Sequence, residues 1–154
     1  MRIKLLCVGQ LSEKWLREAE QEYSKRLSAY CQLEIRSCAE ARAQLPLEQR
    51  LETEGKAILA QLRPQESLYL LDLHGREMDS LAFSDYLIKQ MEIRGGQLVF
   101  AIGGSDGFAP FVRERSCGQI ALSAMTFTHQ MSRILLLEQI YRAFRIYYKQ
   151  PYHK

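Results

Sequence analysis

The sequence predicts one α/β domain over residues 1–154, built on a mainly parallel sheet flanked by helices. Apolar, strand-like runs alternate with segments of helical periodicity along the chain, the pattern of a helix-covered parallel sheet. The run Gln97–Ile102 is continuously apolar, as expected of a strand buried on both faces. Internal repeats and Gly/Ser/Pro linkers are both missing, and the length suits one domain.

The first half of the chain is expected to hold two strands and two helices. Ile3–Val8 is the first predicted strand, and Ser12 is the predicted cap of a helix with apolar residues at 16, 19, 23 and 27. Leu33–Cys38 reads as a second strand. Pro46 opens the second predicted helix, which ends before Pro64.

The second half continues the alternation and places two glycine-bearing turns after strands. The expected elements are a strand at Ser67–Leu73, a helix near Ser80–Ile93, the strand Gln97–Ile102, a short helix near Pro110–Arg115, a strand near Gln119–Leu122 and a long C-terminal helix. Ligands of such sheets bind beyond the carboxyl ends of the strands. The turns at 73–75 and 102–104 are therefore the expected edges of a site.

Composition narrows the class of protein. No apolar run is long enough to span a bilayer. The apolar stretch at the start of the chain is too short, and is interrupted too early, to be a signal peptide. Both observations favour a cytoplasmic protein. The four cysteines lack CxxC spacing, and the three histidines lack metal-ligand spacing. We expect buried free thiols and no metal site.

Charge is distributed unevenly along the chain. Residues 111–154 hold seven Lys/Arg and two Glu, a balance of +5, whereas residues 1–110 carry −2. A basic end on a neutral-to-acidic body suggests an anionic partner, although a solvated helix face would give the same balance. Glu138, Arg142, Arg145 and Lys149 fall on one stripe, which we interpret as such a solvated face.

Two other features of the C-terminal part are candidates for RNA contact. Arg133 lies off the stripe near the helix start, where a guanidinium can form two parallel hydrogen bonds to a phosphate. Tyr152, His153 and Lys154 combine an aromatic ring with basic side chains, as in proteins that stack unpaired bases and contact phosphates. The alternative for this tail is a packed C-terminal anchor.

The segment Gly103-Gly104-Ser105-Asp106-Gly107 follows a buried strand directly. Glycines leave backbone amides accessible to a nucleotide-like ligand, but the same residues also suit a plain turn. Both the Rossmann fingerprint and the P-loop ending are missing, and the sequence holds neither a GxSxG motif nor a paired-carboxylate signature.

Longer motifs resemble one known family. VFAIGGSDG, LSAMTFTHQMSRILLLEQIYRAFRI and the terminal PYHK, together with MRIKLLCVGQL and LYLLDLHG, resemble the ribosomal RNA large subunit methyltransferase H family of the SPOUT superfamily over nearly the whole chain. The resemblance implies a deep C-terminal trefoil knot and a homodimer. It further implies S-adenosylmethionine-dependent methylation of N3 of a pseudouridine in the helix 69 loop of 23S rRNA, on the assembled ribosome, with no membrane or DNA partner.

The resemblance also assigns site residues. The implied cofactor-binding residues are Leu71, Gly103, Leu122, Ser123, Ala124, Met125, Thr126 and Phe127. His129 is a candidate acceptor for the imide proton, a role that water can also fill, and Arg133 is a tentative catalytic as well as RNA-binding residue.

The chain departs from the family pattern at two places. Thr128 stands where the family has proline, which leaves that turn freer, and Lys149-Gln150 replaces a common Gly-Glu.

Two alternatives to the main reading stay open. One is a related knotted methyltransferase acting on tRNA or another rRNA base. The other is a ribosome-associated binding protein without catalysis, against which the intact GGSDG and LSAMTF segments argue.

Overall fold

The fold is a five-stranded parallel sheet with helices on both faces. The computed structural model describes residues 1–152. Its strands are β1 (Arg2–Val8), β2 (Gln32–Cys38), β3 (Leu68–Glu77), β4 (Gln97–Ile102) and β5 (Gly118–Ala121), in the order β2-β1-β4-β3-β5. Its helices are α1 (Lys14–Leu27), α2 (Leu47–Ala60), α3 (Ser80–Ile93), α4 (Pro110–Arg115) and α5 (His129–Tyr147). The predicted parallel sheet flanked by helices is confirmed, because every strand pairing is parallel. The strands and helices also follow one another in the predicted order.

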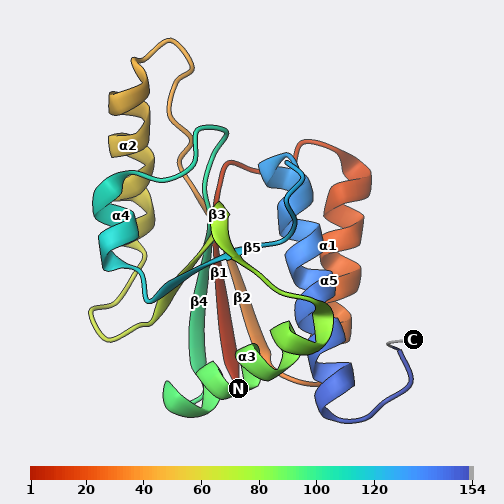
Figure 1. The fold of residues 1–154 in the computed structure, drawn as a ribbon. Coiled ribbons are helices and arrows are strands. Elements are labelled where there is room, and N and C mark those ends of the chain that lie inside the picture. The colour runs from red at the N-terminus through yellow and green to blue at the C-terminus, as the bar shows by residue number, and fades with distance from the viewer. Residues whose placement is uncertain (153–154) are drawn as a thin grey trace.

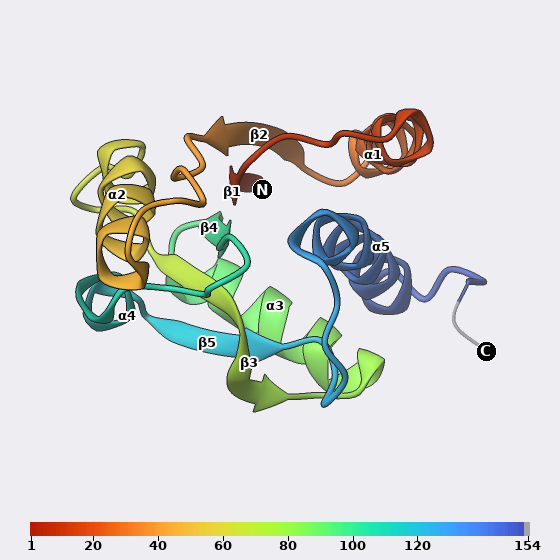
Figure 2. The ribbon, with the colours of Figure 1, turned by 90° about the horizontal axis from the view of Figure 1, so that it is seen from above.

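The helices divide into two layers (Figures 1 and 2). Helices α1, α3 and α5 cover one face of the sheet, and α2 and α4 cover the other. The strands alternate their side chains between these layers, so that Leu5 and Phe100 pack toward α5 whereas Leu6 and Val99 pack toward α2. Apolar side chains on both faces explain why the strand at 97–102 is apolar throughout.

Strand β3 is longer than predicted and its pairing with β5 is interrupted. Ile120 pairs first with Leu71 and again with Arg76, so residues 72–75 form an excursion between two stretches of ladder. At Gly75 a Cβ atom would lie 2.5 Å from the backbone nitrogen and the carbonyl carbon of Ile120. The predicted turn at His74-Gly75 is therefore a crossing of two backbones, for which only glycine leaves room.

The loop between β1 and α1 is tied to the last helix. Ser12 was predicted to cap α1, but the cap residue is Glu13, which makes no side-chain cap bond. The backbone N–H and the hydroxyl of Ser12 instead donate to Oε1 of Gln130, at 2.9 and 3.1 Å. A residue from the start of the chain thus closes onto the start of α5.

The thiols follow the expectation from composition at three of four positions. Cys7, Cys31 and Cys38 are buried and unpaired, and burial raises the pKa of Cys7 to about 12. Cys117 is also free but is exposed, which was not expected. Within residues 1–152, none of the helices has the length and apolarity required to cross a membrane.

Candidate active site

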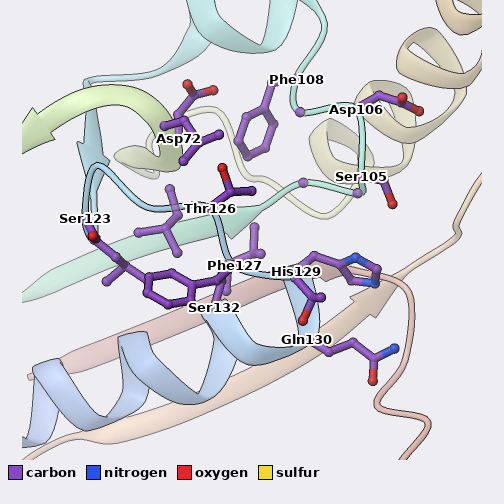
Figure 3. A pocket seen from close by; sticks show the side chains of 18 of the residues that line it. Asp72, Ser105, Asp106, Phe108, Ser123, Thr126, Phe127, His129, Gln130 and Ser132 are labelled. Carbon is purple, nitrogen blue, oxygen red and sulfur yellow. The ribbon is translucent and has the colours of Figure 1, made fainter.

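A large cavity opens at the carboxyl ends of the strands. Its volume is about 840 Å³, within the range of ligand pockets. Its walls come from the exits of β3 and β4, from the start of α1, and from residues 122–128 together with the first turn of α5. Figure 3 shows Asp72 and Phe108 on one side and Phe127, His129 and Gln130 on the other, with Thr126 between them.

The residues implied for cofactor binding converge on this cavity although they come from three separate segments. Seven of the eight line it, namely Leu71, Gly103, Leu122, Ser123, Met125, Thr126 and Phe127. Ala124 is exposed and is not among the lining residues. Within the 122–127 segment the Ser123 hydroxyl accepts a bond from the Met125 N–H at 3.0 Å, which fixes the turn.

An ion pair joins two walls of the cavity. Asp72 is the first residue after Leu71, and its buried carboxylate pairs with Arg113 at 2.6 Å. The guanidinium also donates to Oε1 of Gln119 on β5, at 3.1 Å, and to the carbonyl of Phe108, at 3.3 Å. Arg113 therefore connects the β3 exit, the β4 exit and β5. Pattern reasoning missed both charged residues, although an aspartate within the apolar run LYLLDL was a signal of special placement.

A backbone hydrogen bond closes the glycine loop, residues 103–107, and an ion pair connects the loop to helix α2. Gly107 donates its N–H to the Gly104 carbonyl at 3.2 Å. The loop's Asp106 pairs with Arg50 of α2 at 2.9 Å. The loop's own carboxylate is thus already paired with a cation of the protein.

His129 begins α5 and lines the cavity. Gly9 lies close to the His129 imidazole and to a carboxyl group. A Cβ atom at Gly9 would lie 3.5 Å from Nε2 of His129 and 3.1 Å from Oε2 of Glu40. The imidazole and the Glu40 carboxyl therefore converge above the exit of β1.

Arg133 does not occupy the surface position that was expected for an RNA contact. It is 3% exposed, donates to the Gly9 carbonyl at 2.9 Å and pairs with Glu20 at 3.2 Å. It is not among the residues lining the cavity. As predicted, Arg133 lies off the charged stripe of α5. Its side chain points inward, however, where it connects α5 to Gly9 after β1 and to Glu20 of α1.

Tyr152 also differs from the expectation of a free stacking ring. Its ring packs edge-on against Tyr141 at 5.0 Å, Arg142 lies 4.8 Å over the ring, and the hydroxyl is 3.2 Å from Oε1 of Glu138. Burial, together with contact with Tyr23 and the charge of Glu138, raises the pKa of Tyr152 to about 12. This arrangement is the packed anchor that was the alternative reading. His153 and Lys154 lie outside the described residues.

The same packing corrects the interpretation of the charged stripe. The Glu138 side chain is 16% exposed and that of Arg142 is 25% exposed, because Tyr152 lies across them. Lys149 has a φ of 53°, in the left-handed region that favours glycine. This is the position at which the resemblance places a glycine.

Thr128 adopts the backbone conformation that a proline would impose. Its φ is −62°, against about −65° for proline. Its side chain accepts a bond from the Met131 N–H at 3.2 Å, which makes it the N-cap of α5. The cap bond of Thr128 thus restrains this turn at the position where the family pattern has a proline ring.

Replacing Thr128 by valine should therefore lower the free energy of unfolding by about 1 kcal/mol, the usual contribution of an N-cap. Valine keeps the shape and the β-branch and removes only the acceptor. Urea denaturation followed by circular dichroism measures the change, with Thr53→Val as the matched control, because the Thr53 hydroxyl bonds only within its own helix. Equal stability of Thr128→Val and wild type would show that the cap contributes nothing.

The arrangement suits an amphipathic ligand rather than a metal ion. Leu71, Leu122 and Phe127 offer apolar contact, and the glycine loop offers backbone groups. Within the part of the chain that the structure describes, no group of three or more His, Cys, Asp or Glu residues could hold a metal ion.

Comparison with known proteins identifies the class to which this fold and cavity belong. The family model described as "Predicted SPOUT methyltransferase" matches residues 1–153, and the chain belongs to this methyltransferase family.

Full-length relatives specify the group more closely. Proteins named ribosomal RNA large subunit methyltransferase H are 45% identical in Porphyromonas gingivalis and 41% in Flavobacterium psychrophilum, over 99% of both chains in each case. The protein of that name in Clostridium botulinum is 42% identical over 100% of both chains.

Proposed function

We propose that this protein transfers a methyl group from S-adenosylmethionine to N3 of a pseudouridine in the helix 69 loop of 23S rRNA, on the assembled ribosome. The observation that carries the proposal is the convergence of Leu71, Gly103 and the 122–127 segment on one cavity. The full-length similarity to proteins named as ribosomal RNA large subunit methyltransferases supports rRNA as the substrate class.

The chain's own residues would bind and orient the reactants. When bound, S-adenosylmethionine supplies a methyl group on a sulfonium, which needs no covalent enzyme intermediate. Leu71, Leu122 and Phe127 would form the walls of an adenine site, and the glycine loop would offer backbone hydrogen bonds. Alignment of the methyl carbon with N3 can contribute several kcal/mol to catalysis.

His129 would orient the uracil ring or accept the imide proton, since it lines the cavity on the first turn of α5. The Glu40 carboxyl lies near the same place. In a His129→Gln variant with normal cofactor affinity, single-turnover methylation should be slow, because glutamine cannot accept and release a proton as imidazole can. Methylation by this variant at the wild-type rate would assign proton removal to water.

We further propose that the chain acts as a homodimer with a C-terminal trefoil knot. The close crossing of Gly75 over the backbone of Ile120 supports a chain that passes through a loop at this point. Exposed apolar side chains around the cavity, among them Trp15, Leu73 and Met125, support a partner surface there. RNA binding would then use residues from both protomers, with His153 and Lys154 as tail candidates.

The deciding experiment maps the methylated nucleotide. Purified protein is incubated with labelled S-adenosylmethionine and, in separate reactions, 70S ribosomes, 50S subunits and tRNA. We expect label at one pseudouridine of 23S rRNA, with 70S ribosomes as the best substrate. Label confined to tRNA would establish the alternative of a related methyltransferase, and binding to ribosomes without transfer would establish a non-catalytic protein.

A further inference from the structure

One buried carboxyl group beside the cavity has an oxygen without a partner. Glu54 lies on α2 and is 5% exposed. Its Oε1 accepts a hydrogen bond from the Ala41 N–H at 3.1 Å. Its Oε2 is shielded from solvent and has no hydrogen-bond partner among the described residues. Such groups are rare in folded proteins, because an unmade bond at a buried polar atom costs stability.

The unpaired oxygen faces the glycine loop. A Cβ atom at Gly104 would lie 2.7 Å from Oε2 of Glu54, so the carboxyl group packs directly against the loop. Four residues earlier on the same helix, Arg50 pairs with Asp106 of that loop. Helix α2 therefore contacts the loop at two points, and Figure 3 shows Ser105 and Asp106 beside this helix. Arg50 and Asp106 form an ion pair, whereas Oε2 of Glu54 makes no hydrogen bond among the described residues.

Charged groups around Glu54 do not supply the missing partner. Glu40 and Asp106 repel its negative charge and His129 attracts it, while Arg50 is engaged by Asp106. Burial raises the pKa of Glu54, and the bond from Ala41 opposes that rise only in part. Because the folded-state pKa is raised, the ionised carboxyl destabilises the folded chain at neutral pH, and this cost is relieved as the pH falls through the raised pKa toward the ordinary pKa of a glutamate.

We propose that Glu54 is a positioning residue for cofactor binding, whose Oε2 accepts a backbone N–H of the glycine loop when the loop closes on S-adenosylmethionine. The inference rests on the proposed function, because it concerns the same cavity. In the free protein Glu54 is held in place by Ala41 and lacks its second bond. Ligand binding completes that bond. The free energy that the free protein loses by burying an unpaired oxygen is then regained in the complex, which raises the affinity for the ligand.

A carboxylate is required because two N–H groups must be accepted at once. Glutamine at this position has one acceptor oxygen, so it can keep the bond from Ala41 or receive the loop N–H, but not both. Glu54→Gln should therefore leave the free protein at least as stable as wild type, since a buried charge is removed. It should weaken cofactor binding about tenfold, the equivalent of one hydrogen bond to a charged group.

The test measures the Kd of S-adenosylmethionine by calorimetry and the Tm of the free protein, for wild type and each variant. Glu52→Gln is the matched control on the same helix, because Glu52 is exposed and pairs only with Lys56; its Kd and Tm should equal those of wild type. Gly104→Ala tests the same contact between Glu54 and the glycine loop by a change in the loop. Its methyl group would occupy the space in front of Oε2, and we expect a similar loss of affinity with a folded free protein.

The outcomes separate this inference from the function on which it rests. If wild type binds no S-adenosylmethionine, the proposed function fails. If wild type binds and Glu54→Gln binds equally well, the positioning role is overturned. A Tm of the free Glu54→Gln protein well below that of wild type would also overturn it, because Glu54 would then be a structural residue. Normal cofactor affinity in Gly104→Ala would contradict the role even if Glu54→Gln did not fold.

Discussion

Replacing Gly75 by alanine should lower the free energy of unfolding by about 3 kcal/mol, the upper part of the range for overpacking. The added methyl group would lie 2.5 Å from two backbone atoms of Ile120 and 2.7 Å from the carbonyl carbon of Gln119. Backbone atoms within a strand pairing cannot move aside as the end of a flexible side chain can. Relief therefore requires β3 and β5 to separate, which would also disturb the cavity wall after Leu71.

Urea denaturation measures this change, and His74→Ala is the control. His74 is the exposed neighbour of Gly75, and its replacement should change the free energy of unfolding by less than about 0.5 kcal/mol. A Gly75→Ala protein as stable as wild type would mean that the crossing with β5 is looser than the structure describes.

The second large effect is expected at Arg133. Replacing it by methionine should lower the free energy of unfolding by about 3 kcal/mol, as for removal of one partner of a buried ion pair. The change leaves the Gly9 carbonyl without its donor and Glu20 without its cation. The Nε atom of Arg133 has no hydrogen-bond partner among residues 1–152, so its loss does not add to the effect.

Glu20→Gln provides the comparison, because it leaves the buried Arg133 guanidinium without its counter-charge and should also cost about 3 kcal/mol, as for removal of the other partner of a buried ion pair. Cofactor affinity and RNA affinity of the folded Arg133→Met protein should fall together, if at all, through displacement of the start of α5. Unchanged stability with selective loss of RNA binding would instead restore Arg133 to the RNA-contacting surface.

The fold was predictable from the sequence because its determinants are local. Strands β1, β3 and β4 each contain an apolar run bounded by glycine or a polar segment, and the longer helices carry their own periodicity. The extension of β3 beyond Leu73 was not predictable. The strand resumes after the excursion at 72–75 only because β5 lies there to pair with Arg76 and Glu77.

The candidate site was predictable in its position and less so in its chemistry. The carboxyl ends of β3 and β4 indicated the location, and the resemblance supplied the 122–127 segment. The role of Arg133 depends on Gly9, a residue 124 positions away, and the state of Tyr152 depends on Tyr141 and Glu138. Helical periodicity describes which side of a helix a residue occupies, but it does not say what covers that side.

The hydrogen bonds from Ser12 to Gln130 have a consequence for how the protein is made. A nascent chain emerges from its N-terminus at about 5–20 residues per second, so β1 and the α1 loop are available long before α5. The cavity cannot be completed until Gln130 has left the exit tunnel and can accept the hydrogen bonds of Ser12. Synthesis therefore fixes an order in which the first wall of the cavity waits for the last one, and chains truncated before α5 should contain most of the sheet yet bind no S-adenosylmethionine.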